Sequence, residues 1–265
     1  MQSIDARLIP YKSLSGFDNM AIDEYLISCY KKTKIPVLRI YGWSNSAITL
    51  GRYQDAGCLD TEACREDNVD VVRRITGGGA ILHRNEVTYS LTCSEGDLGG
   101  GRLSVKQSFE RLNSFIIALY REFGLEARYA KETPAEGKPD AYAPFCFSGR
   151  EYYDILIDEK KIGGNAQRRT KDVIFQHGSI PLTLNSYEIQ KYFRNDIDFT
   201  KFTSLHEALH RDVAFPEVAR ILADSCMKTY DFKLFVEELN TLEIKIIHSM
   251  IEDKYFRDRW NLEAG

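Results

Sequence analysis

Cys146 and Lys161 are the two residues whose types and spacing could carry out covalent chemistry. Cys146 lies in PFCFSG between two phenylalanines, and Lys161 follows fifteen positions later in the glycine-rich stretch KIGGNAQRR. An apolar setting raises the pKa of a thiol, whereas a nearby cation lowers it and favours the nucleophilic thiolate. Together the two residues could transfer an acyl group through a thioester. The local sequence alone favours the simpler interpretation that Cys146 is a buried structural cysteine.

A second candidate site is RRITGGGAILH, residues 73–83. Three successive glycines weaken a strand, because they cost backbone entropy and have no Cβ atoms to pack. They allow a ligand to lie directly on the backbone, where N–H groups can converge on an oxygen or a phosphate. The stretch is not a P-loop, because no Lys-Ser/Thr pair follows the glycines. A flexible turn is the alternative, but the flanking arginines and histidine favour a binding site.

KIGGNAQRR supplies a second glycine-rich segment where a strand is expected. Two such segments in one sheet indicate the two walls of a slot that is too narrow for side chains. The alternative is a bulge at a sheet edge with an exposed lysine. The candidate substrate-binding residues of this segment are Gly163, Gly164, Asn165 and Ala166.

The other cysteines and histidines predict neither a metal site nor a disulfide. The six cysteines form no C-x-x-C pair and have no metal-like spacing with the five histidines. In a reducing cytosol we expect them to be free thiols. We interpret His83 and His177 as hydrogen-bonded structural residues rather than as bases.

Composition indicates a soluble globular protein of one large domain, or of one domain with a small appendage. The chain has 265 residues, of which 43% are hydrophobic and 12% aromatic, and its formal net charge is −4. A nucleic-acid binder would usually show a strong basic excess. No apolar run approaches the roughly 18 residues that span a bilayer, and the N-terminus shows no signal-peptide pattern. We therefore expect a cytoplasmic protein that binds neither nucleic acid nor membrane.

The elements expected from periodicity and turn residues give an α+β fold, with a mixed and largely antiparallel sheet flanked by helices. The expected strands are 36–44, 47–54, 70–76, 80–93, 125–130, 154–157, 160–164 and 173–184. We expect a tight Ser-Asn turn to join the first two as a hairpin. The expected helices are 19–32, 61–68, 104–124, 186–193, 204–210, 215–230 and 232–255. We expect residues 1–186 to form the catalytic core and 187–265 a helical part packed on the same domain.

Several stretches together resemble the biotin/lipoate protein ligase and octanoyltransferase superfamily. In chain order they are GFDNMAIDEYL, PVLRIYGWSNSAITLGRYQD, RRITGGGAILHRNEVTYSL, KIGGNAQRR and HGSIPL, within residues 8–185. The tail that ends at Trp260 resembles the helical end of one branch. The resemblance implies a mixed sheet flanked by helices, with the ligand in a tunnel across it.

The resemblance also implies roles for individual residues. Lys161 is expected to contact the acyl carbonyl or the activated carboxyl group. The acceptor is expected to be a lysine of a lipoyl domain or of the glycine-cleavage H protein. The substrate-binding residues implied on the first glycine segment are Arg74, Thr76, Gly77, Gly78, Gly79 and His83.

Two branches of the superfamily fit these motifs. Cysteine-type octanoyltransferases take octanoate from acyl carrier protein through a thioester on a cysteine in a Cys-Phe motif, which Cys146 matches. Lipoate–protein ligases instead make an acyl-adenylate with ATP, and the Gly149-Arg150 pair resembles their motif. The expected function is an octanoyl-[acyl-carrier-protein]:protein N-octanoyltransferase of lipoate biosynthesis that needs no cofactor. The alternative is an ATP- and Mg²⁺-dependent lipoate–protein ligase.

Two further functions are open. One is an amidotransferase that moves octanoyl groups between two lipoyl proteins, which differs from the expected enzyme only in its donor. The other is a non-catalytic acyl-binding protein on a decayed ligase fold. The intact Lys161 and triglycine segment argue against the second, because a decayed site would be expected to lose them.

Overall fold

The structure is a computed structural model that describes residues 3–132, 145 and 151–263. Its central sheet has seven strands in the order β11-β12-β7-β3-β1-β14, with β2 paired to β3. β11, β12, β7 and β3 pair antiparallel, whereas β1 pairs parallel with both β3 and β14. Their bounds are β1 Ile4–Ile9, β2 Ser13–Leu14, β3 Val37–Trp43, β7 Glu86–Cys93, β11 Gly164–Arg169, β12 Ile174–Pro181 and β14 Phe232–Val236.

Two smaller sheets flank the central one. The first has the order β5-β4-β6 and the second the order β13-β10-β9-β8. The three strands of the first are β4 Ala47–Leu50, β5 Asp70–Arg73 and β6 Ile81–His83. The four strands of the second are β8 Arg128–Tyr129, β9 Ile155–Ile157, β10 Lys160–Ile162 and β13 Phe202–Thr203. The mixed pairing of all three sheets, together with the helices, confirms the predicted α+β class.

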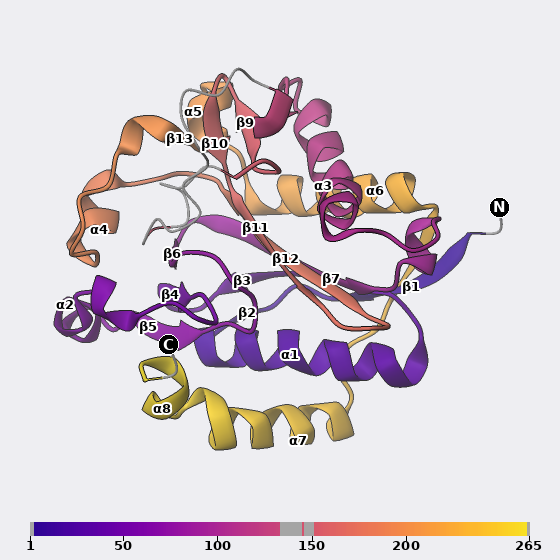
Figure 1. Cartoon of the computed structure of the whole chain (residues 1–265), viewed down its shortest axis with the longest axis horizontal. Helices are drawn as coiled ribbons and strands as arrows, with labels where there is room; N and C mark the ends of the chain where they lie inside the picture. Colours follow the sequence, from indigo (N-terminus) through magenta and orange to yellow (C-terminus); the bar gives the residue numbers. More distant parts are fainter. Residues whose placement is uncertain (1–2, 133–144, 146–150, 264–265) are drawn as a thin grey trace.

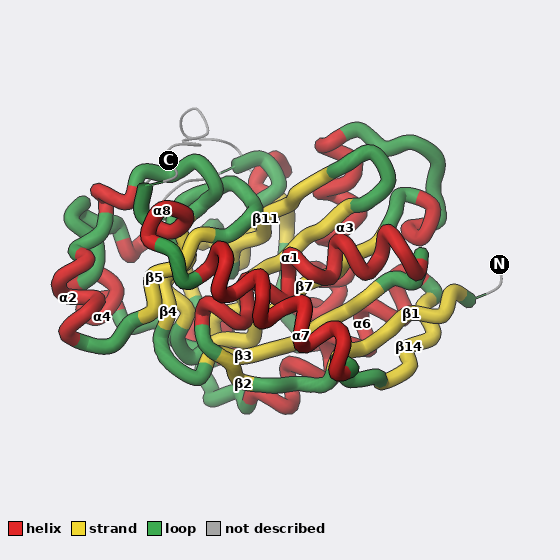
Figure 2. Tube along the Cα trace, turned by 90° about the horizontal axis from the view of Figure 1, so that it is seen from below, coloured by secondary structure: helices red, strands yellow, loops and turns green. Residues whose placement is uncertain are grey.

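Helices cover both faces of the central sheet. α3 and α6 lie on one face and α1 lies on the other, with α7 packed outside α1 (Figure 1). Viewed from the side of α7, the last helices run across α1 (Figure 2). The α-helices are α1 Gly16–Thr33, α2 Thr61–Glu66, α3 Val105–Glu122, α4 Ser186–Lys191, α5 Leu205–Leu209, α6 Phe215–Tyr230, α7 Thr241–Met250 and α8 Asp258–Asn261. Single turns of 3₁₀-helix occur at Ala56–Cys58, Gly96–Leu98, Ala130–Glu132 and Phe199–Lys201, and a π-turn at Ile251–Tyr255.

The main core lies between the central sheet and the α3–α6 pair. It includes Tyr89, Leu91 and Phe115, all fully buried. α3 presents one apolar stripe to this core, as its periodicity predicts. A second core, with Leu26, Val37 and Ile247, joins α1 to the sheet and to α7. The sheet is thus held rigidly between helices, and it provides a firm wall for any site built on its strands.

The structure differs from the predicted elements at several places. The strand predicted over 80–93 is divided into β6 and β7, which belong to different sheets, and the two glycine-rich segments likewise do not share one sheet. Residues 37–43 and 47–50 are both strands, but β3 and β4 belong to different sheets and do not pair with each other. The predicted helix over 232–255 is wrong in its first part, where Phe232–Val236 forms strand β14 on the edge of the central sheet beside β1. Phe232 and Leu234 alternate with more exposed residues, which is a strand pattern, and β1 supplies a partner from the far end of the chain.

The C-terminal segment is anchored to the strand that leads into the triglycine. The indole N–H of Trp260 donates to the carbonyl of Arg73 at 2.9 Å, and the side-chain oxygen of Asn261 accepts from the Arg73 N–H at 3.0 Å. The guanidinium of Arg7 also forms a buried pair with Glu243 of α7 at 2.7 Å. The described part of the C-terminal segment, residues 187–263, therefore packs on the same sheets as the body, and the domain boundary at residue 186 stays a prediction.

Candidate functional site

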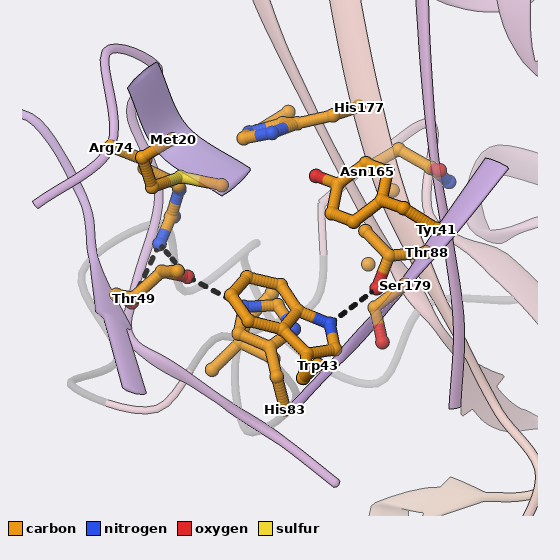
Figure 3. A pocket seen from close by; sticks show the side chains of 14 residues that line it. Met20, Tyr41, Trp43, Thr49, Arg74, His83, Thr88, Asn165, His177 and Ser179 are labelled. Carbon is orange, nitrogen blue, oxygen red and sulfur yellow. Dashed lines mark hydrogen bonds between the residues drawn. The ribbon is translucent and has the colours of Figure 1, made fainter. Parts of the chain in front are cut away.

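A narrow slot lies between the central sheet and the β5-β4-β6 sheet, with the start of α1 beside it. The room inside it is about 20 Å³, which is enough for a single water molecule. Side chains from the two sheets face one another across it (Figure 3). The slot is lined by Met20, Tyr41, Trp43, Thr49, Arg74, Ile81, His83, Thr88, Gly164, Asn165, Ala166, His177, Gly178 and Ser179.

One wall of the slot is organised around the buried carboxylate of Glu86. It is 2.7 Å from Nδ1 of His83, and it accepts hydrogen bonds from the Trp43 indole at 3.2 Å, from Ser179 at 2.5 Å and from Thr88. Burial by itself would raise the pKa of Glu86, but the electrostatic interaction with His83 and the hydrogen bonds with His83, Ser179 and Thr88 leave it below its ordinary value. Glu86 is therefore an ionised anchor for the side chains around it.

Two stacked aromatic rings, those of Trp43 and His83, cover this wall of the slot. Trp43 stacks on His83 with ring centroids 4.0 Å apart, and its indole N–H also donates to Thr88 at 2.8 Å (Figure 3). The other ring nitrogen of His83, Nε2, is 2.8 Å from the hydroxyl of Thr49. Both ends of the imidazole are thus held, and the tryptophan covers its face.

A second network lies around the buried carboxylate of Asp23 in α1. Asp23 pairs with the guanidinium of Arg39 at 2.9 Å and accepts from the hydroxyls of Tyr41 at 2.8 Å and Ser90 at 2.9 Å. It also lies 3.1 Å from Nδ1 of His177. Burial alone would raise the pKa of Asp23, but the hydrogen bond of His177 and the charge of Arg39 hold it below its ordinary value. Asp23 is therefore ionised at neutral pH.

His177 connects this network to the triglycine segment. Its Nε2 atom is 2.7 Å from the hydroxyl of Thr76, which also accepts from Nε of Arg74 at 3.2 Å. Burial lowers the pKa of His177 below its ordinary value, and the attraction of Asp23 opposes that shift only in part. The imidazole is therefore neutral at pH 7.

Arg74 shapes the triglycine segment from the inside of the protein. Its guanidinium donates to the carbonyls of Gly77 at 2.6 Å, Gly79 at 2.8 Å and Thr49 at 2.9 Å. Gly78 has a φ of +91°, and its carbonyl oxygen would lie 1.9 Å from a Cβ built on Gly51. Both positions thus require glycine, one for its backbone angle and the other for close backbone approach.

The two networks leave little hydrogen-bonding capacity on the walls of the slot. The hydroxyls, imidazoles and indole that line it are bonded to one another or to buried carboxylates. The lining residues outside these networks include the apolar Met20, Ile81 and Ala166 and the glycines Gly164 and Gly178. Such a space suits a slender apolar chain, which contributes about 0.8 kcal/mol per buried methylene.

The structure places the predicted site residues in three groups. Five of them line the slot directly: Arg74, His83, Gly164, Asn165 and Ala166. Thr76 is buried behind the lining through its bond to His177, and Gly77, Gly78 and Gly79 form the loop that Arg74 holds. Lys161 lies in β10, and Gly163 comes directly before β11 in the chain. Neither residue lines the slot.

Cys146 lies outside the described residues. Its described neighbour Phe145 forms a parallel bridge with Ala80, the residue directly after the triglycine. Lys161 is buried, and its Nζ atom is 2.8 Å from the carboxylate of Asp154. The described cysteines at 29, 58, 64, 93 and 226 are free thiols, as predicted for them.

Sequence reasoning missed much of the lining. Tyr41 and Trp43 alternate along β3, and Thr88 and Ser90 alternate along β7, so each pair points to one face of a strand. The sequence signal that could have found these lining residues is a polar residue at every second position of a strand that is otherwise buried. Asp23 and Glu86 organise the walls without lining them, and no local pattern marks them.

Among the described residues, no three or more histidine, cysteine, aspartate or glutamate side chains are arranged to hold a metal ion. In the same part of the chain, none of the helices combines the length and the apolar character needed to cross a bilayer.

The fold, with its narrow slot between two sheets, is that of a known family of catalytic domains. Residues 15–227 match the family model of the lipoyl protein ligase A/B catalytic domain, and the chain belongs to this family. The octanoyltransferase LipM of an Exiguobacterium species is 33% identical over 271 aligned positions, which cover 96% of this chain and 96% of that protein. Octanoyltransferase LipM of Bacillus subtilis is 30% identical, over 98% of this chain and 99% of that protein.

Solved structures share the fold at lower identity. A lipoate-protein ligase A bound with ATP gives a TM-score of 0.82 at 20% identity, over 99% of this chain and all 100% of that one. A bipartite lipoate protein ligase from Thermoplasma acidophilum, described with its E2 lipoyl domain, gives 0.80 at 19% identity, over 100% and 98%. These likenesses confirm the predicted fold and extend it over the whole described chain.

Proposed function

We propose that the chain is a protein octanoyltransferase of lipoate biosynthesis that carries octanoate as a thioester on Cys146. The observation that carries the proposal is the slot, whose polar wall atoms are consumed by the Glu86 and Asp23 networks. The slot is narrow, so its side chains must move apart to admit eight carbons. The relatives named octanoyltransferase, which align over nearly the whole chain, support the same activity.

The reaction balances without a cofactor. The Cys146 thiolate attacks the donor thioester, and the donor thiol leaves, so that one thioester replaces another. The acceptor lysine then attacks the acyl-enzyme, an amide forms, and the Cys146 thiol is released. The second step is downhill, because an amide is more stable than a thioester. ATP and Mg²⁺ therefore have no place in this scheme.

Three observations support Cys146 in this role. Phe145, the residue before Cys146, bridges to Ala80, the residue directly after the triglycine. The triglycine N–H groups at Gly77 and Gly78 are on exposed backbone, where they can donate to the oxyanion that forms at the thioester carbon. Lys161 supplies a buried cation close to the slot strand β11, as expected for a group that stabilises the thiolate.

The donor in this proposal is octanoyl-acyl carrier protein, and the acceptor is a lipoyl domain or the glycine-cleavage H protein. The T. acidophilum ligase was described with an E2 lipoyl domain, which supports that acceptor class. We propose that the enzyme acts in the cytoplasm and requires neither nucleic acid nor a membrane. The net charge of −4 does not favour a nucleic-acid partner.

The test is intact-protein mass spectrometry after incubation with octanoyl-acyl carrier protein in the absence of ATP. We expect an octanoyl adduct that hydroxylamine removes, and its complete loss in Cys146→Ala. Cys58→Ala is the matched control, because Cys58 is a half-buried free thiol in a different part of the fold. An adduct that persists in Cys146→Ala would overturn the assignment.

The structural likeness to a ligase bound with ATP favours one alternative, an ATP-dependent lipoate–protein ligase. That enzyme would form an acyl-adenylate from free lipoate and release pyrophosphate. Pyrophosphate release with free lipoate and ATP, without any adduct from the carrier protein, would favour the ligase and return Cys146 to a structural role.

A further inference from the structure

Several cations gather around the indole of Trp260, next to the strand that leads into the triglycine. The guanidinium carbon of Arg52 lies 4.2 Å from the ring centroid, and the Nζ atom of Lys254 lies 3.8 Å from it. Arg73 belongs to the same group, because its Nε atom donates to the Trp260 carbonyl at 2.9 Å. Positive charges from three segments of the chain thus meet at one tryptophan.

Arg168 of β11 adds a fourth cation. Its neighbour Arg169 points toward α3, where it donates to Ser108 at 2.9 Å, so Arg168 points to the opposite face of the strand. Burial lowers the pKa of Lys254, and the charges of Arg52 and Arg168 lower it further. The side chains are therefore close enough to repel one another. We call the four cations and the tryptophan the Trp260 cluster.

One nearby carboxylate balances only part of this charge. Lys254 pairs with Glu24 at 2.6 Å. In the part of the chain that the structure describes, Arg52, Arg73 and Arg168 form no ion pair with an acidic side chain. Like charges that lie close together repel one another, so an anion bound from outside the chain would stabilise the cluster.

Arg73 is the most enclosed member of the cluster. It is fully buried, its Nε and Nη1 atoms donate to backbone carbonyls, and its Nη2 atom has no hydrogen-bond partner among the described residues. Burial lowers the pKa of Arg73, the charge of Arg52 adds to that shift, and Asp55 opposes it only in part. The protein thus keeps a buried guanidinium at the base of the cluster without a paired carboxylate.

The cluster lies beyond one end of the slot. On β11 the lining ends at Ala166, and Arg168 is the next residue on the same face of that strand. On the facing sheet Thr49 of β4 lines the slot, and Arg52 comes shortly after the end of β4. The N–H of Arg52 donates to the carbonyl of Thr76, next to the triglycine, at 2.8 Å. Each wall of the slot therefore continues into an arginine.

The side chains of the cluster suit a phosphate group. Arg168 is exposed and Arg52 is half-buried, so both are open to a ligand that arrives from solvent. The planar guanidinium group binds phosphate oxygens in pairs and stacks on aromatic rings, as Arg52 does on Trp260. In an acyl carrier protein the thioester ends a flexible arm, phosphopantetheine, whose other end is a phosphodiester. The proposed donor therefore carries the kind of anion that the cluster lacks.

We propose that Arg52, Arg168 and Lys254 bind the phosphate of the donor's phosphopantetheine arm, outside the slot that takes the acyl chain. This inference rests on the proposed function and adds to it a separate site for donor recognition. The acceptor lysine carries no phosphate, so the site acts in formation of the octanoyl-enzyme and not in transfer to the acceptor.

The test compares octanoyl-phosphopantetheine with octanoyl-pantetheine, two donors that differ only in the phosphate. Mass spectrometry follows the second-order rate constant of octanoyl-enzyme formation. In the unmodified chain we expect the phosphorylated donor to react about tenfold faster or more, because hydrogen bonds to a charged group are lost without it. The double variant Arg52→Gln/Arg168→Gln should bring this ratio close to one and leave the rate with octanoyl-pantetheine unchanged. Equal rates for the two donors in the unmodified chain would overturn the proposal.

Two further variants separate the site from the fold and from net charge. Arg168→Gln alone replaces an exposed side chain, so it keeps the test valid if the double variant does not fold, and it should lower the ratio by itself. Arg102→Gln removes an equal charge from an exposed position in the loop before α3 and should leave the ratio unchanged. A ratio that falls as far in Arg102→Gln would assign the effect to net charge and overturn the site.

A binding measurement tests the site without any acyl transfer. The chain has two tryptophans, so in Trp43→Phe the indole fluorescence reports Trp260 alone. Phosphopantetheine should change this fluorescence at concentrations at which pantetheine does not. Identical titrations, in a chain that still forms the octanoyl-enzyme, would overturn this inference and leave the proposed function standing.

The carrier protein itself distinguishes two sources of negative charge. If Arg52→Gln/Arg168→Gln slows the reaction of octanoyl-acyl carrier protein while the phosphate on the small donor has no effect, the cluster binds an acidic face of the protein and the proposal is wrong. If no donor forms an octanoyl-enzyme, the proposed function fails, and the assignment of this site to a donor fails with it.

Discussion

The Nζ atom of Lys161 lies 2.8 Å from a carboxylate oxygen of Asp154, and both side chains are nearly buried, with 6% and 12% of their surfaces exposed. The same carboxylate accepts from the N–H of Glu151 at 2.7 Å. Burial and the charge of Asp154 raise the pKa of Glu151. Lys161 is thus the cation that neutralises the nearly buried carboxylate of Asp154, in addition to its proposed catalytic role.

Lys161→Met should therefore lower both stability and acylation. Removing one partner of a buried ion pair leaves an uncompensated charge and typically costs about 3–5 kcal/mol. We expect the free energy of unfolding in urea to fall by that order, and the rate of octanoyl-enzyme formation to fall further than the folded fraction explains. Lys160→Met is the control, since Lys160 is the exposed neighbour on the same strand. A variant with unchanged stability would contradict the structural role of the pair.

The triglycine segment offers a second test, because its glycines have different tasks. Gly78 has a φ of +91°, and a Cβ there would meet Arg74 at 3.0 Å, whereas a Cβ on Gly77 meets nothing within 4 Å. Gly78→Ala should cost about 1–3 kcal/mol, and Gly77→Ala should stay within about 0.5 kcal/mol of the parent. Urea unfolding measures both. Equal costs would show that the backbone angle does not restrict this position.

Local patterns account for the elements that the sequence predicted well. The hairpin at β9 and β10 turns through Asp158 and Glu159, whose φ angles are +48° and +62°, as a two-residue turn requires. Helix α6 occupies Phe215–Tyr230, the predicted range, because its apolar stripe and the proline near its start are local signals. Each of these depends on residues that are neighbours in the chain.

The walls of the slot could not be predicted in the same way. Asp23 meets His177 across 154 positions of sequence, and β14 finds its partner β1 near the other end of the chain. The glycine segments indicated where a slot lies, since glycine reports local close approach. The pairing of each carboxylate with its histidine depends on how the sheets pack against each other. No periodic pattern in the sequence indicates that pairing.

Stability should depend on pH through His177. Burial places its folded pKa below the ordinary value, so the unfolded chain binds the proton more readily than the folded chain does. The contribution of a neutral His177 is therefore fully present above about pH 6.5 and is lost as pH falls toward its lower folded pKa. We expect the free energy of unfolding to decline below about pH 6.5.

His177→Gln is the control for this pH dependence. In that variant the decline should begin only where the carboxylates of Asp23 and Glu86 take up protons. Both have folded pKa values below their ordinary ones, so their contribution is present at neutral pH and is lost under acid conditions. The same profile in both proteins would show that His177 is not the group responsible.

Trp43 should limit the length of acyl chain that the slot accepts. Its ring lines the slot, stacks on His83 at 4.0 Å and is tied to Thr88 at 2.8 Å, in a space of only about 20 Å³. Trp43→Ala removes this fixed ring, so longer chains should be admitted, and each additional buried methylene contributes about 0.8 kcal/mol, or roughly fourfold in binding. We therefore expect the ratio of kcat/KM for dodecanoyl over octanoyl donors to rise. Trp260→Ala, which removes the tryptophan packed beside Tyr255 and Arg73, should leave that ratio unchanged. An unchanged ratio in Trp43→Ala would mean that some other part of the slot measures the chain.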